Sequence, residues 1–201
     1  IKLIDAFMSE LQNPRKQAFS LSTAVDDPLD LLAHLPFRIA VVSNLLALNR
    51  DWKIRNLCDL DPREMRVLIN IGSYMPIKSA DIAYQSRLDS YTVSRAVKKL
   101  LALELIETEP DEHKKNVKNL VLNQKGLQLY QKINKALVER GKILDSALSE
   151  AEREQFYTML GKIEARSEQI LAENALAMID EGMTPPADQK EIIRWHKKSC
   201  T

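Results

Sequence analysis

A run of hydroxyl and cationic side chains between residues 90 and 99 has the chemistry needed to bind a polyanion. At helical spacing the run would lie along one exposed side of a helix. Its members are Ser90, Tyr91, Thr92, Ser94, Arg95, Lys98 and Lys99. Hydroxyl groups can hydrogen-bond to the edges of nucleotide bases, whereas lysine and arginine bind phosphates. We interpret this face as a DNA-contact surface; the alternative is an ordinary amphipathic helix with a solvated polar face.

The apolar residues around this face predict the elements that would position it. They follow helical spacing in two short segments: Ala80, Ile82 and Ala83, then Val93, Ala96, Val97 and Leu100. Leu88 can fill the gap between the two helices, and Asp89 or Ser90 can cap the second. Two short helices joined by a tight turn predict a helix-turn-helix.

A β-hairpin is predicted directly after the second helix. Residues 105–109 alternate like a strand, 110–116 form a polar turn, and 117–122 form a second strand. The tip carries His113, Lys114 and Lys115, which can reach the DNA backbone or the minor groove. The hairpin alone could be a structural flap, but the order helix, helix, hairpin predicts a winged helix-turn-helix, with Ile77–Lys78 as a short third strand.

Four parts of this region follow one another in a recognisable order: LDSYTVSRAVKKL at 88–100, LIE at 105–107, Asp111, and LNQKG at 122–126. Together they resemble the MarR family of transcription regulators. The resemblance extends over about Leu29 to Leu171 and is strongest from Asp61 to Gly126. It implies a homodimer that binds near-palindromic operator DNA and is often released by a small ligand. The fold it implies is mainly α with a small β-wing, the winged helix-turn-helix being flanked by N- and C-terminal dimerisation helices.

Three positions depart from the family pattern. His113 stands where the wing arginine is expected, so either Lys114 or Lys115 replaces that contact or the wing contacts are weaker. Glu104 replaces a glycine after the recognition helix. A non-glycine residue in a left-handed cap costs about 1 kcal/mol, so we expect this helix to end differently. Asn123 replaces a threonine cap, and asparagine caps equally well.

Helical segments surround the predicted DNA-binding domain. We divide the chain into 1–54 (N-terminal segment and long helix), 55–125 (winged helix-turn-helix), 126–180 (C-terminal helices) and 181–201 (tail). Asp27–Pro28 predicts the start of the long helix, with Pro36 kinking or splitting it. Asp61–Glu64 and Ser149–Glu152 are capping boxes that start further helices.

Apolar stripes on the flanking helices need a partner. They occur in residues 1–11, 29–48 and 127–171, and a second copy of the chain could cover them. The alternative is an intramolecular bundle. Family resemblance also implies an effector crevice between dimer body and DNA-binding head, for which the candidate lining is Leu35, Phe37, Trp52, Met65 and Tyr74. The alternative, which these residue types favour, is that the five residues are plain core.

Composition favours binding over catalysis. The net charge of the 201 residues is only +1, which predicts weak non-specific DNA binding. His34, His113 and His196 are scattered, and no nucleotide-binding motif, metal-ligand spacing or catalytic arrangement is present, so we expect no enzyme, metal or cofactor. Cys58 and Cys200 are expected to be simple thiols. No apolar run is long enough for a bilayer and no secretory signal is visible, so a cytoplasmic protein is expected.

Three functions remain open. The first is a sequence-specific DNA-binding regulator. The second is a winged-helix dimerisation or adaptor protein that acts through protein contacts, to which the near-neutral charge and the missing wing arginine give weight. The third is an enzyme with an unrecognised site. Salt-dependent binding to DNA distinguishes the first two.

Overall fold

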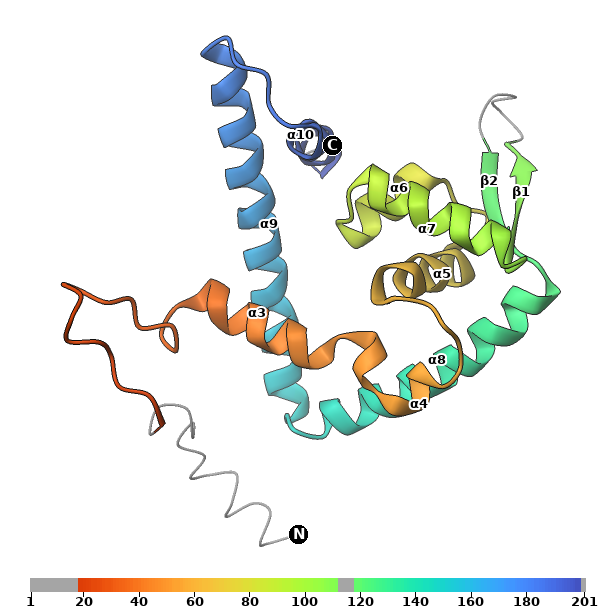
Figure 1. Ribbon diagram of the computed structural model, residues 1–201, viewed down its shortest axis with the longest axis horizontal. Helices are drawn as coiled ribbons and strands as arrows, with labels where there is room; N and C mark the ends of the chain where they lie inside the picture. Colours follow the sequence, from red (N-terminus) through yellow and green to blue (C-terminus); the bar gives the residue numbers. More distant parts are fainter. Residues whose placement is uncertain (1–17, 112–117, 200–201) are drawn as a thin grey trace, which may run out of the picture. The chain divides into compact units, whose positions relative to one another are not determined.

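The computed structural model describes residues 18–111 and 118–199, and its chain divides after Arg50 into two compact units (Figure 1). The apolar segment 1–11 and the wing tip at 112–117 lie outside the described residues. Each unit is considered by itself below.

The first unit contains helix α3 (Leu35–Leu46) and the 3₁₀ helix η1 (Leu48–Arg50). The predicted start at Pro28 is wrong, because Asp27 is left-handed (φ 52°) and the Asp30 carboxylate accepts the Leu32 amide at 2.9 Å, which forms a local turn. Pro36 instead lies in the first turn of α3. A proline is favourable there, since the first amides of a helix have no intrahelical partner. Pro36 therefore marks the beginning of the helix and does not kink it.

The second unit begins with two capped helices. Asp51 caps the short helix α4 (Trp52–Arg55), which the sequence did not suggest. Helix α5 (Pro62–Tyr74) has the predicted capping box: the Asp61 carboxylate accepts the Arg63 and Glu64 amides, and Glu64 accepts the Asp61 amide at 2.8 Å. The capping box is thereby confirmed.

The helix-turn-helix is formed by α6 (Ser79–Ser86) and α7 (Ser90–Ala102). Both pack on α5, and the three helices enclose the core of the head. Its fully buried side chains include Met65, Val67, Leu68, Ile71, Ile82, Val93 and Leu100. Burying each such aliphatic side chain stabilises the fold by about 1.5–3 kcal/mol, so this packing fixes which face of α7 stays outside.

The wing is an antiparallel pair of strands, β1 (Ile106–Pro110) and β2 (Lys118–Leu122). Ile106 pairs with Leu122 and Pro110 with Lys118. Ile77 adds a bridge to Leu120, with its amide donating at 3.3 Å and its carbonyl accepting at 2.8 Å. The predicted hairpin is confirmed, whereas the predicted third strand at Ile77–Lys78 is only a single bridge from Ile77 to β2.

Three helices complete the chain: α8 (Gln124–Asp145), α9 (Glu150–Asp180) and α10 (Ala187–Ser199). Asn123 caps α8 by accepting the Gly126 amide at 2.9 Å, and Ser149 and Glu152 form the predicted capping box of α9. Helix α10 packs against α9. Among the residues that the structure describes, no helix is long and apolar enough to span a bilayer.

The end of α7 differs from the expectation. Glu104 adopts the left-handed conformation (φ 55°) that a glycine would favour, and the Leu105 amide donates back to the Leu100 carbonyl at 3.0 Å. The expectation of a different helix end is therefore wrong. Two features hold this turn in place despite the steric cost of a positive φ at Glu104. Leu105 and Ile106 are buried, and Asn123 Nδ2 donates a 2.8 Å hydrogen bond to the Glu104 carbonyl.

Replacing Glu104 with glycine should stabilise the protein by about 1 kcal/mol, because glycine adopts a positive φ without a steric penalty. The measurement is the free energy of unfolding in urea. Leu103→Gly is the matched control: Leu103 has φ −83°, so glycine should destabilise there. Equal shifts of the same sign for the two variants would contradict the argument.

Gly126→Ala should destabilise the protein by about 1–3 kcal/mol, since overpacking forces the backbone to move. A Cβ at this position would lie 1.8 Å from the carbonyl oxygen of Leu105. In the same helix, a Cβ at Gly141 would meet nothing within 4 Å. Gly141→Ala should therefore be neutral or stabilising in the same thermal and urea unfolding measurements, and a similar loss in both variants would refute the steric explanation.

Candidate nucleic-acid interface

The start of the recognition helix α7 is held by Asp89. Its carboxylate accepts the Thr92 amide at 2.8 Å and the Thr92 hydroxyl at 2.7 Å. The hydrogen bond from the Thr92 side chain, followed by that from its amide, lowers the pKa of Asp89 below its usual value. The cap is therefore ionised at neutral pH and is lost only as the pH falls through this lowered pKa. The Thr92 hydroxyl is engaged in the cap, whereas the sequence had placed it on the DNA-contact face.

The remaining predicted contact residues of α7 are exposed on the side opposite its buried residues Val93, Ala96 and Leu100. These exposed residues are Ser90, Tyr91, Ser94, Arg95 and Lys98. The Arg95 guanidinium lies 5.8 Å from the centre of the Tyr91 ring, a cation–π distance. The structure thus brings an aromatic hydroxyl, a small hydroxyl and two cations onto one face.

Lys99 differs from the other cations of α7 because it is paired within the head. Its Nζ lies 2.8 Å from Glu64 Oε2 and 3.4 Å from the Asp59 carbonyl. The hydrogen bond to Glu64 raises the pKa of Lys99 above its usual value. A DNA phosphate would have to compete with Glu64 for this ammonium group.

The end of the wing strands next to the tip is fixed by an ion pair that the sequence did not suggest. Lys78 Nζ lies 2.7 Å from Asp111 Oδ2, and the Asp111 side chain is almost buried. Asp111 is the acidic wing residue of the family resemblance, and Lys78 follows Ile77, which pairs with β2. The predicted tip contacts His113, Lys114 and Lys115 lie outside the described residues.

The five residues proposed for an effector crevice occupy different surroundings. Met65 is fully buried in the core of the head, whereas Trp52 and Tyr74 are mostly exposed. Leu35 and Phe37 belong to the first unit. Their grouping around a ligand stays a prediction.

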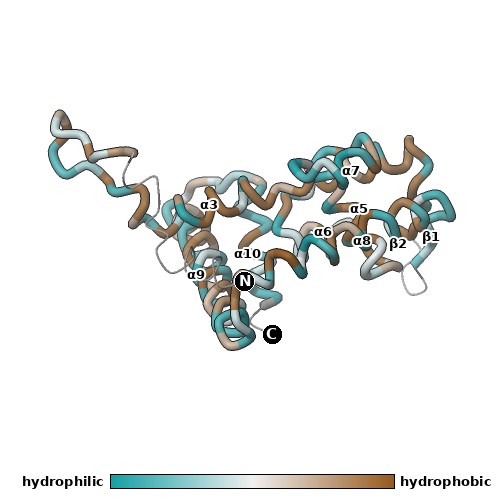
Figure 2. Tube along the Cα trace, turned by 90° about the horizontal axis from the view of Figure 1, so that it is seen from below, coloured by the Kyte–Doolittle hydropathy of each residue, from teal (hydrophilic) through white to brown (hydrophobic). Residues whose placement is uncertain are grey.

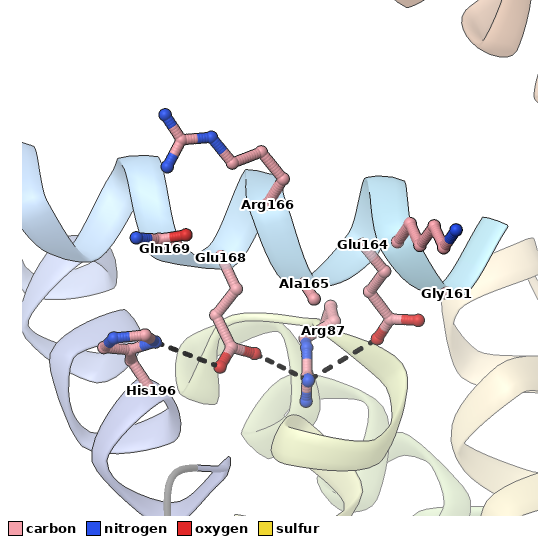
Figure 3. A pocket seen from close by; sticks show the side chains of 9 residues that line it. Arg87, Gly161, Glu164, Ala165, Arg166, Glu168, Gln169 and His196 are labelled. Atoms are coloured by element: carbon pink, nitrogen blue, oxygen red, sulfur yellow. Dashed lines mark ion pairs between the residues drawn. The ribbon is translucent and has the colours of Figure 1, made fainter. Parts of the chain in front are cut away.

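A second polar cluster lies where the α6–α7 turn meets α9 and α10 (Figure 3). Arg87, in a left-handed conformation (φ 51°), pairs with Glu168 at 2.6 Å and Glu164 at 3.5 Å. His196 of α10 lies 3.8 Å from Glu168 on the other side. From α10, Glu191 accepts the backbone amide of Ser90 at 3.1 Å. Sequence reasoning missed this cluster because the partners are distant: Arg87 is 77 and 81 positions from Glu164 and Glu168, and Ser90 is 101 positions from Glu191.

Neither cysteine chemistry nor metal binding is indicated. Burial raises the pKa of the Cys58 thiol, which disfavours the reactive thiolate. Cys200 lies outside the described residues. In the described part of the chain, no three histidine, cysteine, aspartate or glutamate side chains gather in a way that could hold a metal ion.

Comparison with known proteins matches the geometry. Residues 59–115 match the family model described as MarR family. The MarR/EmrR family transcriptional regulator from Acinetobacter sp. ADP1 is 26% identical, with a TM-score of 0.64 over 70% of this chain and 99% of that one. No curated protein matches the sequence.

Two more distant structures share the fold. MepR from S. aureus, solved as a MepR–DNA complex, is 23% identical with a TM-score of 0.59, over 66% of this chain and 98% of that one. PcaV from Streptomyces coelicolor is a transcriptional regulator solved with its natural ligand. It is 15% identical, with a TM-score of 0.59 over 69% of this chain and 97% of PcaV. The family match at 59–115 covers the helix-turn-helix and the first strand of the wing, so this part of the chain is similar to the winged helix-turn-helix of the MarR family.

Proposed function

We propose that this protein is a transcription regulator that binds near-palindromic operator DNA as a homodimer. The observation that carries the proposal is the exposed polar face of α7, formed by Tyr91, Ser94, Arg95 and Lys98, on a helix that leads directly into the wing. Solved relatives are named as transcriptional regulators, and one of them was solved with DNA. In this proposal the protein acts in the cytoplasm by binding, not by catalysis.

The exposed face gives each side chain a role. An α-helix fits the major groove, where base edges are distinguishable. Ser90, Tyr91 and Ser94 would contact base edges, and Arg95 and Lys98 would contact phosphates. The cation–π contact with Tyr91 would orient Arg95. His113, Lys114 and Lys115 would provide the wing contacts.

The apolar faces of the flanking helices support the homodimer. No residue of α3 is buried in the single chain, and α8 and α9 also leave large apolar side chains exposed. Figure 2 shows hydrophobic residues along all three helices. These exposed residues include Ile39, Val42, Leu45, Val138, Ile143, Phe156, Met159, Ile170 and Leu171. Apolar surface of this extent marks an interaction site, and a second copy would cover it. Residues 1–54 and 126–180 would form the dimer body, and 55–125 the head.

A small-molecule effector would act through the spacing of the two heads. In PcaV a natural ligand is bound in the solved structure. In this chain the proposed lining is Leu35, Phe37, Trp52, Met65 and Tyr74. A ligand that binds one head spacing better than the other shifts the population towards it and so changes operator affinity.

Selection of bound sequences from a random duplex pool tests the proposed function. We expect an inverted repeat whose half-sites are about one helical turn, ~34 Å, apart, because two recognition helices would enter successive major grooves on one side of the duplex. Sizing chromatography should give the mass of two chains. A dimer that enriches no sequence would favour the adaptor function instead.

Single substitutions on α7 should separate the proposed roles. Arg95→Ala should weaken binding to all duplexes by about tenfold and reduce the salt dependence by about one phosphate contact. Ser94→Ala and Tyr91→Ala should change the preference among sequences. Affinities are measured by fluorescence anisotropy at several salt concentrations.

The control for Arg95→Ala is Lys135→Ala, which removes an exposed cation from α8. It should leave operator affinity within about twofold, because screening weakens distant charges. Equal losses for Arg95→Ala, Ser94→Ala and Tyr91→Ala on every sequence would refute the assignment of roles.

A further inference from the structure

The C-terminal helix α10 contacts the head at the first residue of the recognition helix. The Glu191 carboxylate accepts the backbone N–H of Ser90, with 3.1 Å between the two atoms. Glu191 is itself buried, at 9% exposure, although it is ionisable and lies on a short helix near the end of the chain. Its burial and its hydrogen bond to the Ser90 amide hold the Glu191 carboxylate in a defined position at the start of α7.

A set of contacts around the α6–α7 turn supports this position (Figure 3). Arg87 is paired with Glu164 and Glu168 of α9, and its guanidinium lies 4.4 Å from the Tyr84 ring and 5.7 Å from the Trp195 ring of α10. The turn that precedes α7 is therefore held from both α9 and α10.

Lys198, near the end of α10, makes the last contact with α6. Its Nζ lies 3.3 Å from Asp81 and 4.5 Å from the centre of the Tyr84 ring. Contacts thus extend along α10 from Glu191 to Lys198. Three residues of α10, Glu191, Trp195 and Lys198, therefore contact the start of α7, the turn and α6.

The same backbone position is a natural site for a DNA phosphate. The first amides of a helix have no intrahelical partner and carry the positive end of the helix dipole, so they bind anions. Protein–DNA complexes use helix N-termini in this way. A carboxylate on the Ser90 amide occupies a donor that DNA would use, and it adds negative charge where phosphates approach.

We propose that α10 is an autoinhibitory segment: Glu191 occupies the N-terminus of the recognition helix, and α10 must move away before operator DNA binds. The inference rests on the proposed function of DNA binding. Only the fraction of molecules with α10 released is competent, so the apparent affinity is lowered by that fraction. Intramolecular couplings of this kind change affinities by about 5- to 150-fold.

Two pairs of full-length variants test the proposal by operator affinity, measured by anisotropy with the selected duplex. Glu191→Gln should tighten binding by about fivefold or more, because it removes the charge from the blocking contact. Its control is Asp188→Asn on the same helix, since the Asp188 carboxylate accepts the adjacent Gln189 amide at 3.0 Å and is exposed. The control removes the same charge and should change affinity less than twofold.

In the second pair of variants, autoinhibition and simple electrostatics predict opposite changes in operator affinity. Lys198→Ala removes a cation, which by charge alone would weaken DNA binding. If α10 is inhibitory, losing its contacts with Asp81 and Tyr84 should instead tighten binding by about twofold. Lys190→Ala removes an exposed cation of the same helix and should weaken binding slightly or leave it unchanged.

The outcomes are distinguishable. Tighter binding for Glu191→Gln and Lys198→Ala, without the change in their controls, supports the proposal. Unchanged or weaker binding for these two variants, with the wild-type protein binding its operator, overturns autoinhibition and leaves the proposed function intact. If no folded variant binds any duplex, the proposed function fails and the autoinhibition falls with it.

Discussion

The packing of α7 against α5 determines most of what this protein can do. Val93, Ala96 and Leu100 are buried on one side of α7, against a helix whose own Met65, Leu68 and Ile71 are fully buried. Rotating α7 about its axis would expose these side chains, at about 1.5–3 kcal/mol each. The orientation of Tyr91, Ser94, Arg95 and Lys98 is therefore set by the apolar side of the helix, not by the polar residues themselves.

Local features were predictable because their determinants are close together in the sequence. Asp89 caps α7, Asp61 and Glu64 start α5, and Ser149 and Glu152 start α9, as short-range spacing indicated. The error at the N-terminal helix also has a local cause. Two Pro-containing starts compete, and the Asp30 side chain stabilises a turn that delays the helix until Leu35, with Pro36 in its first turn. Glu104 shows the limit of backbone preference, because tertiary packing holds it left-handed.

Charge pairing was not predictable, because the partners are distant in sequence. Lys99 and Glu64 are separated by 35 positions, and Ser90 and Glu191 by 101. A sequence shows that α7 has three cations, but only the fold shows that one of them is neutralised by α5. Although the net charge of the 201 residues is only +1, charge is distributed unevenly. Arg95 and Lys98 remain exposed on the polar side of α7.

Asn123 connects α8 to the end of α7 over a very short distance. The Asn123 side chain caps α8 through Oδ1 and donates through Nδ2 to the Glu104 carbonyl at the end of α7. In the first turn of α8, Gly126 lies so close to the Leu105 carbonyl that a Cβ would not fit. The end of α7 and the start of α8 are therefore held rigidly together. A change in the tilt of α8 is transmitted to α7 and to the helices packed on it, because the connection between α7 and α8 has little freedom to bend.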